Sequence, residues 1–310
     1  MANEVLVSGL GDLTVSEILA QEIGLLLADR ASFRNGAYLV DVGDVRGTGS
    51  TVRKQGFAGL DGYDEMAAVA EGSSVSNTAL TDGSQTVTVA RQALQYSESD
   101  LADLILPDGS VNVERLAASM VASAEMRFTS MVANVIDDFT QSVGTTGTDM
   151  TFTKYQQAIF YIERAPAPSA DLVSIMAPIQ ITDLQGDLFG VVGVAQYLPA
   201  TAEMVQAKGQ GLQGRLLGCD VFKSSKVVTS GGDRKGGMWH RGAVLYAEGT
   251  PKAIKSPTFM IAAGTKLLIE FERDASAGLT KIVGNFYTGV ARNTVSPNEL
   301  LGVTILSSAT

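Results

Sequence analysis

The chain has 310 residues, of which 45% are hydrophobic and 18% charged, so it is long and apolar enough to bury a core and is not a disordered chain. Its formal net charge of −10 argues against a protein that reads nucleic-acid sequence through a basic surface, although enclosing DNA at a distance stays open. One cysteine and one histidine exclude a disulfide framework, a Cys-x-x-Cys zinc site and a histidine-rich metal site, and we expect no cofactor.

The first predicted element is a short helix near the N-terminus. Thr14 and Glu17 form a capping box, and apolar residues follow at helical spacing as far as Asp29. No basic region typical of a secretory signal precedes it, and no apolar run approaches the ~18 residues that cross a bilayer. We therefore expect no contact with a membrane. Residues 38–42 then predict a strand.

From residue 46 to residue 86 the chain becomes rich in glycine and poor in apolar residues. Residues 52–57 and 87–91 have β-character, residues 66–72 are weakly apolar, and residues 81–84 offer turn chemistry. One interpretation is a disordered loop. We favour a long hairpin that becomes ordered against another molecule, because so long a segment with so little core material should not stand alone.

A short helix over residues 96–104, capped by Ser97 or Ser99, is predicted next. Residues 111–139 then carry apolar residues every three or four positions, which predicts a helix of roughly 43 Å. Gly144 and Gly147 lie beyond its end. Such a helix is either a core helix of an α/β enzyme or a spine laid across a sheet.

The pattern after Gly147 alternates helices and strands. Thr153 and Gln156 form a second capping box, and Pro178 suits the first turn of a helix that carries Ile181, Leu184 and Leu188. Another short helix is predicted at residues 200–207. Strands are predicted at residues 171–176, 216–222 and 243–247, with Cys219 as a small buried apolar group.

The glycine-rich segments in this region do not fit phosphate-binding motifs. Residues 230–237 are predicted as a loop but lack the Gly-Lys-Ser/Thr ending and a following helix, and residues 208–214 match the dinucleotide fingerprint in glycine content only. A catalytic triad would have to use His240, which lies in a loop entering a strand and which we interpret as structural.

The last segment is rich in β-strand signals. Residues 265–273 are expected to pair with residues 280–288 across a turn at Gly278, and residues 303–306 close the chain as a further strand. These strands would give the long helix a sheet to lie on.

The order of these parts resembles the major capsid proteins of tailed bacteriophages, which have the Hong Kong 97-like fold. The resemblance covers essentially the whole chain and depends on the order and spacing of segments that are not catalytic. They are residues 70–72 with Leu80 and 87–91, residues 97–101 with 111–139, residues 175–178 with Leu184, and residues 214–225.

The resemblance implies an α+β capsid fold in five parts. They are an N-terminal arm with a short helix at residues 1–45, an extended β-hairpin loop at 46–86, a peripheral domain with the spine helix at 87–145, an α/β axial domain at 146–255, and a return to the peripheral-domain sheet at 256–310.

The resemblance also implies a structural protein and not an enzyme. It would be made in the host bacterial cytoplasm and would self-assemble as hexamers and pentamers into the icosahedral shell of the virion, enclosing double-stranded DNA without sequence-specific binding. A portal and a separate scaffolding protein are expected partners. Some relatives carry a removable N-terminal scaffolding segment, and because the first helix begins near Thr14 here, either the scaffolding protein is separate or the chain is the mature form; the Met1 start favours the former. A decoration protein is a further candidate partner.

Candidate contacts between subunits are Arg53, Lys54, Phe57, Glu71 and Arg91, in the loop and its return. For each charged residue taken singly, a solvated face is the alternative. Some relatives crosslink a loop lysine to a distant asparagine. No motif marks such a partner for Lys54, and we expect no crosslink.

Two alternative functions stay open. An encapsulin-like nanocompartment would keep the fold and enclose a cargo enzyme. A soluble α/β enzyme would use a carboxylate pair, for example Asp137 with Asp138 or Asp183 with Asp187. These pairs are predicted on solvated helix faces, and one tryptophan with 6% aromatic residues argues against a sugar-binding cleft.

Overall fold

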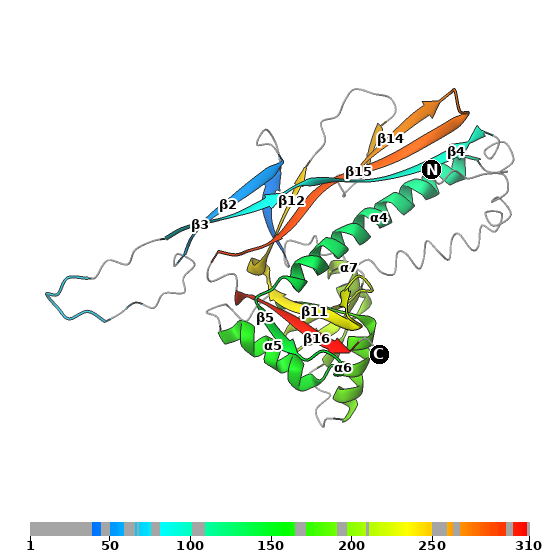
Figure 1. Ribbon diagram of the computed structural model, residues 1–310. Coiled ribbons are helices and arrows are strands. Elements are labelled where there is room, and N and C mark those ends of the chain that lie inside the picture. The colour runs from blue at the N-terminus through cyan, green and yellow to red at the C-terminus, as the bar shows by residue number, and fades with distance from the viewer. Residues whose placement is uncertain are drawn as a thin grey trace.

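The computed structural model describes residues 39–44, 50–58, 66, 68–75, 81–100, 109–164, 172–190, 197–208, 211–249, 259–262, 267–295 and 300–308. The predicted N-terminal helix lies outside these residues. The described chain is mixed α+β, with two sheets joined by one long helix and a hairpin that projects from the body (Figure 1).

The first sheet is organised around one long strand, β15 (Leu279–Arg292). Along one edge β15 pairs with β4 (Ala90–Ser99), and along the other with β14 (Leu267–Asp274) and then β12 (Val244–Gly249). The predicted pairing across Gly278 is confirmed, with Arg273 opposite Thr280. The outer strands on that side are β1 (Val40–Asp44), parallel to β12, and β13 (Phe259–Ala262), beside β14.

The second sheet has a fully buried central strand, β6 (Leu172–Met176), as its sequence predicts. Helices α5 (Phe152–Arg164) and α6 (Pro178–Gly190) bury Tyr155, Ile159, Leu184 and other apolar residues in the same core as β6. Short α7 (Ala202–Lys208) packs the partly buried Met204 and Val205 against a second hydrophobic cluster, which includes Phe128 and Trp239. The sheet order is β5 (Gln141–Gly144), β16 (Gly302–Ser308), β11 (Asp233–His240), β6, β9 (Cys219–Lys223), β8 (Leu212–Leu216) and β7 (Tyr197–Pro199), with β10 (Val228–Ser230) beside β11.

Helix α4 (Gly109–Asp137) is the predicted spine, and it joins the two sheets. Met120 contacts Gly284 of β15, whereas Ile136, four turns later, lies against Gly237 of β11. The Thr304 hydroxyl of β16 donates a hydrogen bond of 2.7 Å to the Ile136 carbonyl. Because both sheets contact the helix, its buried face is wider than the narrow stripe that the sequence indicates.

One hydrophobic core runs through both sheets. Phe128 of α4 packs edge-on against Tyr246 of β12, with ring centroids 6.0 Å apart, and Trp239 of β11 and Phe286 of β15 are buried in the same cluster. The chain passes between the sheets at α4, after β15, and through the 3-10 turn η3 (Arg241–Ala243) between β11 and β12. The two sheets are therefore parts of one packed unit.

Two predictions near the hairpin are wrong. Residues 96–99 are strand and not helix, because they pair with β15 from Tyr96 opposite Ile282 to Ser99 opposite Leu279. Their serines and acids resemble a helix cap, but long-range pairing overrides that local preference. Residues 81–84 are also strand and not turn.

Local turn chemistry corrects three further predictions. Residues 216–222 form a hairpin and not one strand, since Leu217 and Gly218 have φ of 50° and 84°, the left-handed pair of a tight turn. Residues 230–237 hold the β10–β11 hairpin and not a loop. The cap of α5 is Thr151, whose hydroxyl accepts from the Lys154 amide at 3.4 Å, and not Thr153.

The sheets also cut across the expected parts of the chain. Strand β16 lies in the sheet of β6 and β11, although its residues were expected to return to the peripheral sheet. Strand β12 lies in the sheet of β15, although its residues fall in the expected axial segment. The division into five parts stays a prediction, but β12 and β16 each lie in the sheet to which the division does not assign them.

Candidate inter-subunit surface

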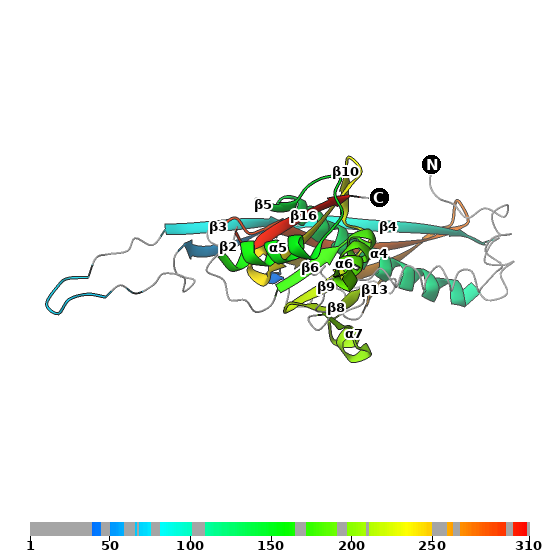
Figure 2. The same cartoon turned by 90° about the horizontal axis from the view of Figure 1, so that it is seen from below.

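The part of the described chain that projects from the two sheets is the hairpin formed by β2 (Thr51–Ala58) and β3 (Thr81–Thr88) (Figure 1). Its strands pair over eight residues each, from Thr51 opposite Thr88 to Ala58 opposite Thr81. Both views show it extending away from the two sheets, with β3 leading almost in line into β4 (Figures 1 and 2). The predicted hairpin is thus present, but the chain turns before residues 81–84, which belong to strand β3.

The root of the hairpin is packed into its own subunit. Val87 is fully buried with Leu245 and Ala247 of β12, and Val52 packs partly against the same small cluster. The Thr294 hydroxyl donates a hydrogen bond to the side-chain oxygen of Gln85. These contacts fix the direction in which the hairpin leaves the body.

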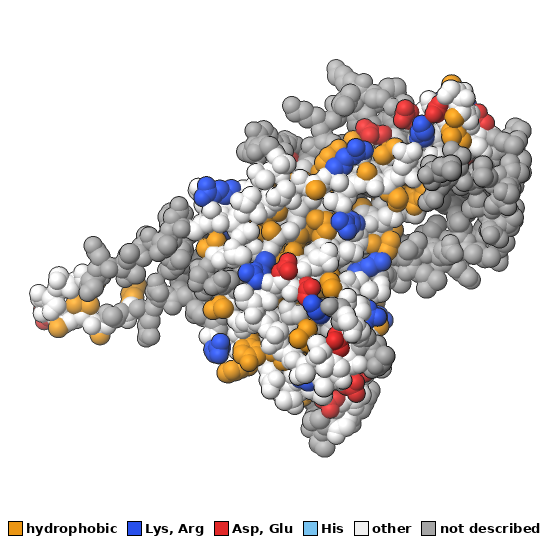
Figure 3. All heavy atoms as spheres, viewed as in Figure 1, with side chains coloured by type: hydrophobic (Ala, Val, Ile, Leu, Met, Phe, Trp, Pro, Cys, Tyr) orange, Lys and Arg blue, Asp and Glu red, His pale blue; other side chains and the backbone are white. Residues whose placement is uncertain are grey.

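The far end of the hairpin has no such support among the described residues. Met66, Val69 and Val75 are 98%, 46% and 76% exposed. The Ser73 amide donates to the Ala70 carbonyl at 3.0 Å around Gly72, whose φ is 81°, so this stretch makes a tight turn of its own. In the space-filling view hydrophobic side chains gather at this end (Figure 3). Apolar groups presented in this way are a candidate surface for contact with another molecule.

The predicted contact residues lie in different places. Arg53 is exposed and Lys54 half-buried on β2, and Glu71 is exposed in the far turn. The backbone of Phe57 pairs with Asp82, and its side chain is outside the described part. The structure therefore gathers these residues along the hairpin and not into one cluster.

Arg91 is bound within its own subunit. Its Nε donates to Oδ1 of Asn285 at 2.7 Å, and Nδ2 of Asn285 donates to Oε2 of Glu270 at 2.8 Å. Arg91 thus links β4 to β15 and β14, and its role in a contact between subunits stays a prediction.

Three of the four carboxylates that an enzyme would require have structural partners, and Asp138 is exposed, as expected for a solvated helix face. Oδ2 of Asp187 accepts from the Phe152 amide at 2.6 Å, and Asp183 accepts from the Met150 amide, so these half-buried residues of α6 face the segment that begins α5 and are not on a solvated face. Asp137 forms an ion pair of 2.6 Å with Lys235. No group of three or more metal-binding side chains occurs in the described part of the chain.

His240 has the structural role that its sequence context indicates. Its Nδ1 accepts from the Gly242 amide at 3.3 Å and so caps η3, where the chain passes from one sheet to the other. Its backbone amide donates to the Leu301 carbonyl at 2.9 Å. None of the described helices is long and apolar enough to cross a membrane.

No protein-family model matches the sequence, and no curated protein matches it. Solved structures do match. The capsid of Ralstonia phage GP4 is 12% identical with a TM-score of 0.57, over 88% of this chain and 86% of that one. The capsid of the cyanophage P-SCSP1u is 12% identical with a TM-score of 0.55, over 91% and 89%.

An encapsulin is similar to the same degree. The SrpI encapsulin from Synechococcus elongatus PCC 7942 is 13% identical with a TM-score of 0.58, over 84% of each chain. What the three share with this chain over most of its length is the arrangement of helices and strands. The chain has the Hong Kong 97-like capsid fold.

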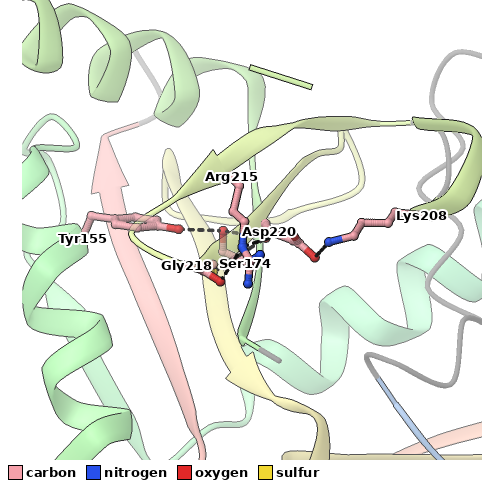
Figure 4. A network of polar contacts seen from close by, with 7 residues as sticks. Tyr155, Ser174, Lys208, Arg215, Gly218 and Asp220 are labelled. Carbon is pink, nitrogen blue, oxygen red and sulfur yellow. Dashed lines mark hydrogen bonds and ion pairs between the residues drawn. The ribbon is translucent and has the colours of Figure 1, made fainter. Parts of the chain in front are cut away.

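A buried polar network lies inside the second sheet of this capsid fold (Figure 4). The Tyr155 hydroxyl lies 3.4 Å from that of Ser174, which donates to the Asp220 carbonyl at 3.5 Å. Burial raises the pKa of Tyr155 well above its ordinary value and the pKa of Cys219 to about 12. A reactive thiol is partly exposed and has a lowered pKa. These groups are neutral and buried, so they position strands and are not a reaction centre.

The sequence did not show that Met66, Val69 and Val75 are the most exposed apolar groups of the hairpin. The sequence feature that could have indicated it is a set of apolar residues between glycines without helical or strand periodicity. In a capsid fold such a segment indicates a candidate contact surface and not a weak core.

Proposed function

We propose that this chain is a major capsid protein, a structural protein and not an enzyme, that self-assembles into the icosahedral shell of a tailed-phage virion around double-stranded DNA. The observation that carries the proposal is the hairpin, with its root buried against Leu245 and its far end holding Met66 almost fully exposed. A free subunit gains nothing from such an arm. A neighbouring subunit that covers it turns the exposed apolar area into binding free energy, at ~25 cal/mol per Å².

The charge of the chain suits this role. A net charge of −10 limits attachment of the shell to the DNA it contains. Hexamers and pentamers of the chain are the expected assemblies. A portal and a separate scaffolding protein are proposed partners for assembly in the host cytoplasm, and a decoration protein is a further candidate.

Electron microscopy of the purified protein tests the proposal. Closed shells of uniform size support it, whereas a ~33 kDa monomer that forms no larger assembly at any concentration contradicts it. Charge reversal of Glu71, with Lys226→Glu on the body as the matched control, then examines the hairpin. If Glu71→Lys leaves both particle yield and heat stability unchanged, Glu71 is not a contact residue.

A nanocompartment is the second candidate, because the encapsulin is as similar to this chain as the phage capsids are. The contents of particles purified from the native source separate the two. Packaged double-stranded DNA supports the phage capsid, and a single enriched cargo protein without DNA supports the nanocompartment.

A further inference from the structure

The methionines of the chain differ strongly in their access to solvent. Of those whose side chains the structure describes, four lie in the hydrophobic clusters and are at most 2% exposed, namely Met120, Met150, Met176 and Met238. Three more are half-buried on helices, namely Met126, Met131 and Met204. Met66 is 98% exposed. Within the described part of the chain, its thioether is therefore the one that a dissolved oxidant reaches most easily.

The surroundings of Met66 are apolar. Val69 and Val75 follow it at the far end of the hairpin and are 46% and 76% exposed, and neither side chain can donate a hydrogen bond. Figure 3 shows hydrophobic side chains gathered at this end. A thioether suits such a surface, because methionine is flexible and polarizable and fits irregular apolar partners.

Oxidation changes this side chain from apolar to polar. Hydrogen peroxide transfers one oxygen atom to the thioether: the O–O bond breaks, an S–O bond forms, the sulfur loses two electrons and the peroxide leaves as water. The product, methionine sulfoxide, is polar and chiral. A methionine sulfoxide reductase reverses the step, since its thiols supply two electrons, become a disulfide and release the oxygen as water.

A sulfoxide at the end of the hairpin opposes burial of that end. Covering its oxygen without a hydrogen-bond donor costs free energy, whereas covering the thioether is favourable. We propose that Met66 is an oxidation site, at which peroxide converts a subunit that assembles into one that does not, until a methionine sulfoxide reductase restores it. This inference rests on the proposed function, because the cost arises when a neighbouring subunit covers the hairpin.

The single thiol of the chain does not compete for the oxidant. Cys219 is fully buried, and burial raises its pKa to about 12, so the reactive thiolate is almost absent at neutral pH. Mild peroxide treatment of the native subunit therefore acts on exposed thioethers first.

Mass spectrometry of free subunits treated with hydrogen peroxide measures the selectivity of oxidation. The peptide that contains Met66 should gain one oxygen about tenfold faster, or more, than those that contain Met120 and Met238. In assembled particles the rate at Met66 should fall towards the rate of these core methionines. Equal rates for Met66 and Met238 in free subunits would overturn the inference, as would an unchanged rate at Met66 in particles.

The effect on assembly is tested with Met66→Leu, which keeps an apolar side chain of similar volume and has no sulfur. Peroxide should lower the particle yield of the wild type about tenfold or more, and reductases for both sulfoxide epimers should restore it. Met66→Leu should assemble equally well before and after peroxide. Met204→Leu is the matched control and should stay as sensitive as the wild type. If peroxide lowers the yield of Met66→Leu as much as that of the wild type, the damage lies elsewhere and the inference fails.

Met66→Gln examines the same site without an oxidant. Its side chain is polar at all times, so untreated Met66→Gln should give about tenfold fewer particles while its melting temperature as a free subunit stays that of the wild type. Wild-type yield from this variant would contradict the inference.

These measurements also separate the inference from the proposed function. If wild-type subunits oxidised fully at Met66 assemble as well as untreated ones, the inference fails and the proposed function stands. If untreated wild-type subunits form no particles under any condition, the proposed function fails, and the inference fails with it.

Discussion

The ammonium group of Lys208 on α7 lies 2.6 Å from Oδ2 of Asp220 on β9, whose side chain is only 7% exposed. Arg215 of β8 lies 3.9 Å from the other carboxylate oxygen and also donates to the Gly218 carbonyl at 3.0 Å. One buried carboxylate thus ties a helix and a hairpin to the same sheet, as Figure 4 shows.

Replacing Lys208 by Met should destabilise the subunit by about 1–3 kcal/mol, because a buried carboxylate loses its closest cation. Urea unfolding of the free subunit measures the change. Lys226→Met is the control, since Lys226 is exposed and a comparable loss of charge there should have little effect. Equal unfolding midpoints for the two variants would show that the ion pair contributes no stability.

Helix α4 packs closely against β11 at Gly237. A Cβ added there would lie 2.1 Å from Cγ2 of Ile136, so Gly237→Ala should cost about 1–3 kcal/mol by forcing the helix away from the sheet. Gly186 in α6 has open space around it, and Gly186→Ala should instead stabilise the subunit by about 0.5–1 kcal/mol. Thermal unfolding distinguishes the two, and a neutral Gly237→Ala would argue against the close packing of helix and sheet.

Asp183 gives a stability effect that depends on pH. Burial raises its pKa above the ordinary 3.8, with Asp149 adding to the effect, although the Met150 amide opposes it. A carboxyl whose folded pKa is raised destabilises the fold when ionised. That cost is fully present above the folded pKa, and it disappears as the pH falls below the unfolded value.

We therefore expect Asp183→Asn to raise the melting temperature at pH 7, with a gain that shrinks towards zero near ~pH 3. Asp187→Asn, one turn along α6, is the matched comparison. It should lower stability by about 0.3–1 kcal/mol at pH 7, because it removes an anion from the start of α5. A lower melting temperature for Asp183→Asn at pH 7 would refute the assigned cause of the shift.

Cys219 should resist thiol reagents in the native protein. It is fully buried, and its pKa is raised to about 12, so almost no thiolate forms at neutral pH. Dithionitrobenzoate is expected to react only at the rate of unfolding, whereas a cysteine placed at exposed Ser73 should react at once. Fast reaction of the wild-type protein would contradict the burial of Cys219.

Elements with strong periodicity or a long apolar run could be predicted from the sequence. The spacing of Met120, Ala124 and Phe128 predicts α4, and the run that includes Val173 and Ile175 predicts β6. Both predictions are confirmed, because in these segments the local pattern and the burial in the final fold agree.

The elements that were wrong are those in which a distant strand overrides local chemistry. Ser97 and Ser99 resemble helix caps, yet their backbone pairs with β15, which follows almost two hundred positions later. Which sheet β16 joins depends likewise on its antiparallel pairing with β11. No local pattern contains that information.

The sequence predicted that the candidate contact surface lies on a hairpin, but it did not predict how each candidate residue is bonded. The hairpin follows from glycine content and scarce apolar residues, and its far end is exposed as expected. The internal bond from Arg91 to Asn285 was not predictable, since it depends on the register of β4 against β15.

The core shared by Phe128, Trp239 and Phe286 has a mechanical consequence for any closed particle built from this subunit. A close-packed interior resists bending, so the subunit has to keep nearly the same shape at every position. Five-fold and six-fold rings must then differ in the angles at which neighbours meet. In the proposed shell the radius of the particle is accordingly set at those junctions and by the hairpin that is proposed to bridge them.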